Sequence, residues 1–176
     1  DDALVGGVRE GGLVANAVIR YDLSDPAAPR ESARYLWPTT DSVAGLAVVG
    51  DLAYVLVGPT TARRLEILDV SDPDAIVNLG APTLGRTGNF THVRVAGGRL
   101  ALLQRTSGVA DLFSLADPLA PSFLSSVNTG AGTNGVDLRL TSGHLLIRHT
   151  TGTGSSSTVR VWSLANPSSP AATVAR

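Results

Sequence analysis

The amino-acid sequence predicts an all-β protein built from four-stranded antiparallel sheets. Three observations lead to this prediction. An Asx-Pro pair recurs four times at intervals of 47, 45 and 49 residues, a strand-like segment precedes each pair, and a hairpin pattern with a Gly-containing turn lies between successive pairs. Units repeated at such a period bury their apolar faces by stacking on their neighbours.

The four Asx-Pro pairs are predicted to form tight corners between strands. The side chain of Asp or Asn accepts a hydrogen bond from the backbone two residues on, and proline presets φ for the second position of a type I turn. A residue that every copy needs for its turn is more often structural than catalytic. We therefore assign to turns Asp25, Pro26, Asp72, Pro73, Asp117, Pro118, Asn166 and Pro167.

The segments before the corners are predicted to be strands. They read "VIRYDLS" from Val18, "LEILDVS" from Leu65, "ADLFSLA" from Ala110 and "VRVWSLA" from Val159. Their period-2 order of β-branched and aromatic residues is typical of strands and not of helices. Aligned on one another, they share a bulky column (Tyr21, Leu68, Phe113, Trp162) and a small polar column (Asp22, Asp69, Ser114, Ser163).

Between the corners, three segments read as two strands around a tight turn: "GLAVVGDLAYVLV" (45–57), "HVRVAGGRLALLQ" (92–104) and "DLRLTSGHLLIRH" (137–149). The second strand of each is apolar at consecutive positions, as expected where both faces are covered. One period is then four strands, A to D, and such sheets repeated side by side are the blades of a β-propeller. We expect one domain over 1–176, with blades at 1–37, 38–83, 84–128 and 129–176.

The first copy starts at the second strand position, with "ALVGGV" (3–8), and so lacks its innermost strand. We expect sequence after residue 176 to complete a ring of more than four blades; a strand from a partner and an open arc are the alternatives. Because the chain contains no Met, Asp1 is expected to be a processed end, an internal fragment edge or an engineered boundary.

The stretch "LEILDVSDPDAIVNLG" (65–80) resembles the LVIVD repeat, a strand, Asp-Val-Ser-Asp-Pro, spacer, strand unit. "VIRYDLSDPAAP" keeps the signature, "DLFSLADPLAP" loses one Asp, and "VRVWSLANPSSP" has Asn at the corner. The resemblance covers strands C and D of all four copies. It implies a propeller of the kind found in bacterial and archaeal surface or secreted proteins, and no shared catalytic motif comes with it.

Composition restricts the function classes. The absence of cysteine excludes a disulfide scaffold, a thiolate metal site and a Cys nucleophile. The net charge is −1 and every basic residue is Arg, so the overall field gives no reason to expect nucleic acid or an anionic membrane as partner. No run of about 18 apolar residues occurs, so no membrane-spanning helix is expected.

Candidate binding residues come from the D–A and B–C connections, which differ in every copy and are predicted to lie at one rim. Arginines there indicate an anionic partner, although Arg63 and Arg64 equally suit a soluble strand edge. Trp37 and Phe90 are the aromatics best placed for exposure, unless they pack under their loops. The candidates are Trp37, Asp41, Arg63, Arg64, Arg86, Phe90, His92, Arg105 and His149, with Arg148 near the same rim.

Histidine gives the only hint of a metal. His144 and His149 are five apart in a strand and point to opposite faces. His92 and His149 could share a ligand set with Asp41 or Asp137, but no close ligand pair supports it, so neither metal nor cofactor is predicted. No G-x-S-x-G elbow marks a serine nucleophile, and no catalytic residue is assigned.

The leading interpretation is a non-enzymatic propeller that binds another protein, or the remainder of a larger propeller, in a bacterial extracellular or cell-envelope assembly. The alternative is a propeller enzyme or ligand-binding protein that recognises an anionic glycan or similar ligand at the variable rim. Variant activity at His92 and Arg105 would distinguish the two.

Overall fold

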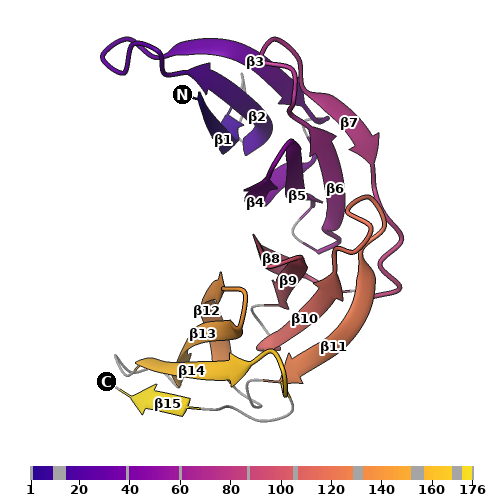
Figure 1. The fold of residues 1–176 in the computed structure, drawn as a ribbon, viewed down its shortest axis with the longest axis vertical. Coiled ribbons are helices and arrows are strands. Elements are labelled where there is room, and N and C mark those ends of the chain that lie inside the picture. The colour runs from indigo at the N-terminus through magenta and orange to yellow at the C-terminus, as the bar shows by residue number, and fades with distance from the viewer. Residues whose placement is uncertain are drawn as a thin grey trace. The chain divides into compact units, whose positions relative to one another are not determined.

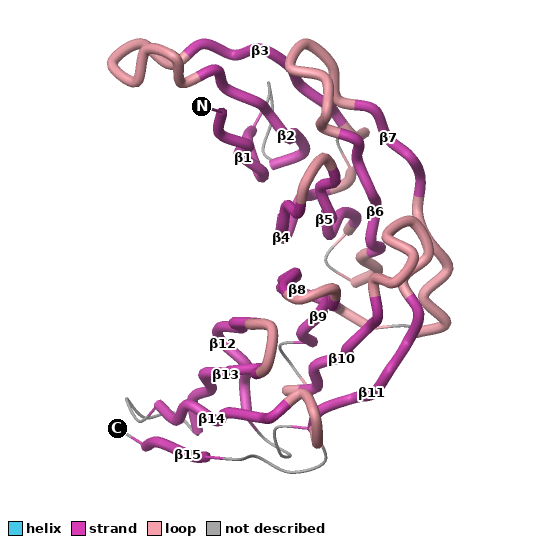
Figure 2. Tube along the Cα trace, viewed as in Figure 1, coloured by secondary structure: helices cyan, strands magenta, loops and turns pink. Residues whose placement is uncertain are grey.

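The computed structural model describes residues 2–9, 15–38, 40–59, 61–86, 88–104, 107–128, 133–151, 157–167 and 172–175. All regular structure within these residues is β-strand, and the fifteen strands form four antiparallel sheets (Figure 1, Figure 2). The prediction of an all-β chain with sheets of the propeller-blade type is confirmed. We call the sheets blades 1 to 4 in chain order.

Blades 1 and 2 form one compact unit, Asp1–Pro82. Blade 1 has three strands in the order β1-β2-β3, and blade 2 has four in the order β4-β5-β6-β7. Blade 1 therefore begins with the strand that was predicted to hold the second position. The strands are β1 (Asp2–Arg9), β2 (Ala15–Asp22), β3 (Arg30–Leu36), β4 (Ser42–Val49), β5 (Leu52–Gly58), β6 (Arg64–Asp69) and β7 (Val77–Gly80).

Blades 3 and 4 form a second compact unit, Thr83–Arg176. Both have four strands, in the orders β8-β9-β10-β11 and β12-β13-β14-β15. A single domain over the whole chain, the four blade boundaries and a larger ring all stay predictions. The strands are β8 (Phe90–Ala96), β9 (Arg99–Gln104), β10 (Val109–Ser114), β11 (Ser122–Asn128), β12 (Thr133–Leu140), β13 (His144–Thr151), β14 (Ser157–Ser163) and β15 (Ala172–Ala175).

Local hydrogen bonds shape the C–D corners. Asp25, Asp72 and Asp117 each accept a bond from the backbone N–H two residues on, at 3.0, 2.9 and 3.0 Å. Asn166 and Pro167 occupy the fourth corner, where the backbone N–H of Asn166 donates to the carbonyl of Ser163 at 3.2 Å. Because these side chains complete turns, their oxygens serve the backbone.

The side chains of the small polar column, three residues before each corner Asp or Asn, also accept hydrogen bonds from the nearby backbone. Asp22 and Asp69 accept bonds from the backbone N–H two residues on at 2.8 and 2.9 Å, and Ser114 and Ser163 do so at 3.2 and 3.3 Å. The backbone N–H of Ser24 lowers the pKa of Asp22, and the hydroxyl and N–H of Ser71 lower the pKa of Asp69. Each of the three Asp-Pro corners therefore carries two successive side-chain turns.

Another repeated bond ties each of three corners to the A–B turn of its own sheet. The backbone N–H of Val70 donates to the carbonyl of Asp51 at 2.8 Å, Leu115 to Gly98 at 2.8 Å, and Leu164 to Gly143 at 2.9 Å. Each of the three donors directly follows the small polar column in the sequence. The corner and the turn at this end of a blade are thus fastened together.

The core of each unit lies between its two blades. Val18, Ala33 and Trp37 of blade 1 pack with Val55 and Leu68 of blade 2 in the first unit. In the second unit, residues of blades 3 and 4 share a cluster: Ala101, Leu103, Ala110, Leu112, Val127, Leu138, Leu145, Ile147, Trp162 and Leu164. Residues 53–57 of β5 and 100–103 of β9 are all fully buried, so both faces of these second strands are covered.

Candidate functional site

Trp37, a predicted exposed aromatic, is buried directly after β3, with 4% of its surface exposed. Its backbone N–H donates to the carbonyl of Asn16 at 3.0 Å, and Asn16 Nδ2 donates back to the carbonyl of Trp37 at 2.8 Å. The Tyr35 ring meets the indole edge to face at 4.7 Å between centroids. The alternative in which Trp37 packs under its loop is therefore the one observed.

The indole N–H of Trp37 donates to a buried carboxylate on the neighbouring blade. Glu66 of β6 is 5% exposed, and its Oε2 accepts from Trp37 Nε1 and from Asn78 Nδ2, each at 2.6 Å. Its Oε1 accepts from Arg64 Nε at 2.6 Å. A buried carboxylate is tolerated only when it is paired and hydrogen-bonded in this way. Both oxygens are engaged, so Glu66 joins the two blades and is not poised as a base.

Arg64 extends this network to the D–A connection. Its Nη2 lies 2.8 Å from Asp41 Oδ2 and 2.6 Å from Glu66 Oε1. Burial lowers the pKa of Arg64, but its hydrogen bonds to Asp41 and Glu66 outweigh that effect and the pKa is raised. The charge predicted to attract an anion is thus neutralised by two carboxylates. We call Tyr35, Trp37, Asp41, Arg64, Glu66 and Asn78 the Glu66 network.

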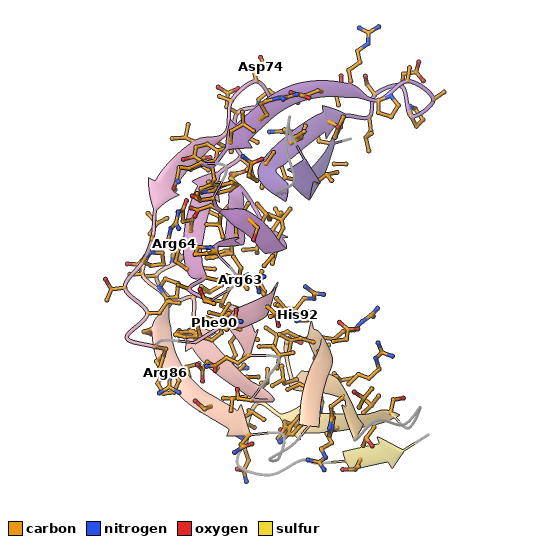
Figure 3. The ribbon with its side chains drawn as sticks, turned by 180° about the vertical axis from the view of Figure 1, so that it is seen from behind. Arg63, Arg64, Asp74, Arg86, Phe90 and His92 are labelled. Carbon is orange, nitrogen blue, oxygen red and sulfur yellow. The ribbon has the colours of Figure 1, made fainter. Side chains whose placement is uncertain are left out.

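Arg63 lies beside Arg64, immediately before β6, and Figure 3 labels both. Burial lowers the pKa of Arg63. The preceding loop is so tight that Gly58, at φ +130°, has no room for a side chain. A Cβ there would lie 2.8 Å from the carbonyl oxygen of Ala62. Arg63 is half-buried, so the structure does not present it as an open cation on a rim.

A second buried carboxylate holds Arg86 in blade 3. Asp111 of β10 is fully buried, and its Oδ1 accepts from Ser126 Oγ at 2.5 Å. Arg86 reaches the two oxygens of Asp111 at 3.3 and 3.4 Å and lies over the Phe123 ring at 4.8 Å from its centroid. The guanidinium of Arg86 is therefore engaged with Asp111, Ser126 and Phe123.

Glu66 and Asp111 were missed as candidates although they occupy the same place in two copies. They stand second in "LEILD" and "ADLFS", between apolar neighbours, and Arg160 stands there in blade 4. A charged residue inside a strand that is otherwise apolar on both sides was the available signal. The bulky and small polar columns described above lie two and three positions further along the strand and do not include this position.

The histidines do not come together as a ligand set. Nδ1 of His92 lies 2.9 Å from Thr91 Oγ1, whereas His149 is fully buried and neither of its ring nitrogens is hydrogen-bonded to a described residue. His144 is exposed, so the two histidines of β13 lie on opposite faces as their spacing predicts. Burial, with a smaller effect of Arg160, lowers the pKa of His149. No cluster of three metal-ligating side chains exists among the described residues.

Of the two remaining candidates, the structure describes only Phe90. Phe90, labelled with Arg86 and His92 in Figure 3, begins β8 and is 2% exposed, so it too packs under its loop. Arg105 lies outside the described residues. The predicted candidates thus divide into a buried network in the first unit and separate positions in the second.

Exposed apolar side chains gather instead on outermost strands. On β11, "SFLSSVN", Phe123 and Leu124 are 44% and 51% exposed, and Leu119 of the preceding corner is 51% exposed. On β7, Val77 and Leu79 are 52% and 46% exposed. By contrast β3, the outermost strand of blade 1, carries Arg30, Glu31 and Arg34. Charged edges resist pairing with other chains, and β11 lacks this protection.

The geometry defines an all-β, propeller-like protein whose buried polar groups join strands and blades. No family model and no curated protein sequence matches the chain. Known structures show the same fold. A protein from Lactobacillus plantarum has a TM-score of 0.70 and 15% identity over 98% of this chain and 52% of its own.

The hydrazine synthase of Kuenenia stuttgartiensis has a TM-score of 0.67 and 10% identity over 92% of this chain and 44% of its own. A chain of a nidogen/laminin complex has a TM-score of 0.58 and 10% identity over 96% of this chain and 59% of its own. The chain thus spans about half the length of these propeller-like neighbours, whose functions differ. Among the described residues no helix is long and apolar enough to cross a membrane.

Proposed function

We propose that this chain is a non-enzymatic propeller module that binds another protein through the outer edge of blade 3. The resemblance of its repeats to the LVIVD family supports a bacterial extracellular or cell-envelope setting, which forms part of the same proposal. The observation that carries the proposal is the uncharged, apolar and exposed outermost strand β11.

The edge of β11 suits strand addition. The strand is seven residues long, pairs with β10 on one side only within the described residues, and contains no Lys, Arg, Asp, Glu or Pro. A partner strand that adds to such an edge gains main-chain hydrogen bonds, and exposed side chains such as Phe123 and Leu124 give it specificity. The expected partner is a protein with an extended segment whose apolar side chains pack on Phe123 and Leu124.

The buried polar clusters around Glu66 and Asp111 support a structural role for these residues over a catalytic one. Glu66 and Asp111, the buried carboxylates, have both oxygens occupied by Trp, Asn, Arg or Ser donors. A general base needs an oxygen within reach of a substrate proton. Glu66 instead joins blades 1 and 2, and Asp111 holds Arg86 and Ser126 within blade 3, which presents the β11 edge.

The test is a comparison of two lysine substitutions. The partner is purified from secreted and envelope fractions of the source with the tagged chain, and its affinity is then measured with the purified pair. Leu124→Lys should abolish binding, because a charge would enter the edge. Leu36→Lys, at a similarly exposed position (48%) on the already charged β3, should leave the affinity unchanged.

Both variants change an exposed side chain, so their stability should differ little from that of the parent chain, within about 0.5 kcal/mol. Equal affinities for the parent chain and Leu124→Lys would refute the β11 edge as the binding site. Recovery of no partner that binds the purified chain would refute the proposed role.

A further inference from the structure

Arg86 lies beside the outermost strand of blade 3 and keeps part of its guanidinium unused. Its Nε and Nη2 face the two oxygens of Asp111, and Nη2 also donates to Ser126 Oγ at 3.1 Å. Its Nη1 makes no hydrogen bond or ion pair with a described residue, and the side chain is 39% exposed. Arginine carries five N–H donors, so the two on Nη1 remain available to a ligand.

An arginine in blade 2 shows how such a group is completed. Glu66 and Asp111 occupy equivalent positions of the repeat, on β6 and β10. Arg64 pairs with the buried Glu66 and also with Asp41, at 2.6 and 2.8 Å. Arg86 is exposed to a similar extent, but among the described residues it pairs with one carboxylate, that of Asp111. Blade 3 therefore lacks the second carboxylate that the chain itself supplies in blade 2.

The pairing of Arg86 with Asp111 is also looser. Nη2 and Nε lie 3.3 and 3.4 Å from the carboxylate oxygens, whereas charge-assisted N–H···O bonds are usually about 2.7 to 2.9 Å long. Asp111 is fully buried and accepts a shorter bond, of 2.5 Å, from Ser126 Oγ. Because the hydroxyl shares in satisfying Asp111, Arg86 can pair with a second carboxylate while it keeps the first, as Arg64 does.

Strand register determines which residue of an added strand would meet Arg86. Ser126 of β11 pairs with Asp111 of β10, and the pairing is regular over residues 125–128. A strand that adds to the outer edge of β11 continues this row. Side chains directly opposite one another share a face, with Cβ atoms about 4.5 to 5.5 Å apart. The added residue opposite Ser126 therefore lies beside Arg86, which already contacts Ser126.

The same face carries an exposed aromatic ring further along β11. Phe123 pairs with Phe113, and the two rings meet edge to face at 5.8 Å between centroids. Arg86 lies over the Phe123 ring while it reaches Asp111, so these groups share one side of the sheet. Phe123 is 44% exposed. A strand recognised here should therefore combine a carboxylate with an apolar side chain two positions away.

We propose that the β11 edge selects an extended protein segment in which an acidic residue, opposite Ser126, pairs with Arg86. An apolar residue two positions along the segment packs on Phe123. This inference rests on the proposed function and adds a charge preference to it. A neutral residue opposite Ser126 would leave Nη1 of Arg86 unpaired, and a basic residue would be repelled.

Three capped heptapeptides test this preference without altering the protein. Their sequence is Thr-Val-Thr-X-Thr-Val-Thr, with glutamate, glutamine or lysine at X, so that in a strand the central side chain and both valines share one face. Because the sequence is symmetric, parallel and antiparallel addition give the same row of side chains. In NMR titrations of the whole chain, the glutamate peptide should bind about fivefold more tightly than the glutamine peptide, and the lysine peptide most weakly. The difference should shrink as salt increases.

A double substitution assigns the preference to Arg86. Arg86→Gln together with Asp111→Asn removes the exposed and the buried charge at once, so no unpaired carboxylate is left inside blade 3. This double variant should bind the glutamate and glutamine peptides equally. Arg30→Gln, at an exposed arginine on β3, should keep the difference between them.

The outcomes separate this inference from the proposed function. Equal binding of the glutamate and glutamine peptides by the parent chain would refute the acidic preference. If Leu124→Lys then abolishes binding of the glutamine peptide, the β11 edge remains the binding site. A preference that persists in the double variant would refute the role of Arg86. Absence of binding by all three peptides would also overturn the inference, whereas the proposed function is decided by the purified partner.

Discussion

Replacing Trp37 by phenylalanine should destabilise the chain by about 2 to 3 kcal/mol. The substitution keeps a ring under the loop but deletes the indole N–H that donates to Glu66 Oε2 at 2.6 Å. A hydrogen bond to a charged group contributes about 1.5 to 3 kcal/mol, and the smaller ring adds a packing loss. Asn78 still donates to the same oxygen, which keeps the loss at the lower end of the sum.

Urea unfolding followed by far-ultraviolet circular dichroism measures this loss, since the variant retains only one of the two Trp residues as a fluorescent reporter. Tyr35→Phe is the control: it removes a neutral hydroxyl that accepts from Asn78 at 2.9 Å and should cost about 0.5 to 1.5 kcal/mol. A double-mutant cycle with Glu66→Gln should give a coupling energy of at least about 1 kcal/mol. Additive effects of the two substitutions, or a loss below about 0.5 kcal/mol for Trp37→Phe, would refute the assignment.

Three further predictions concern the second unit. Gly97→Ala should destabilise more than Gly98→Ala, because both glycines have positive φ (+56° and +69°) but only at Gly97 would a Cβ meet backbone of the next blade, at 2.7 Å; equal losses in thermal unfolding would contradict this. Ser126→Ala removes the donor 2.5 Å from a fully buried carboxylate and should cost about 1.5 to 3 kcal/mol in urea unfolding, while Ser122→Ala on the same strand should be neutral. Because the pKa of His149 is lowered from 6.5 in the folded chain, the unfolded chain binds the proton first, so the free energy of unfolding should fall as pH drops below about 6.5, and His149→Val should remove that part of the pH dependence.

The strands and corners could be predicted because their causes are local. An Asp-Pro pair and a polar residue three positions before it complete turns by bonds to the nearest backbone N–H groups, as Asp22 and Asp25 do. The bulky column of the strands before the corners includes Leu68, Phe113 and Trp162, and all three are buried. These strands and corners can be predicted without knowing which blades are neighbours.

The Glu66 network could not be predicted in the same way, because its bonds depend on packing between segments far apart in the chain. Trp37 and Glu66 are 29 positions apart, and Arg86 and Asp111 are 25 apart. Their positions in or beside loops indicated that Trp37 and Arg64 were available to a partner. In the structure Trp37 is buried, and Arg64 is paired with Asp41 and Glu66.

In blades 2 to 4, the repeated bond from the C–D corner to the A–B turn gives the two ends of a blade different roles. At the end with this bond, register depends on contacts such as Val70 to Asp51 that each of these three blades makes within its own sheet. The B–C and D–A connections at the other end are relieved of that duty, so they can lengthen or change composition during evolution without shifting the strands. The same asymmetry would let an engineer graft foreign loops there while leaving the corners untouched.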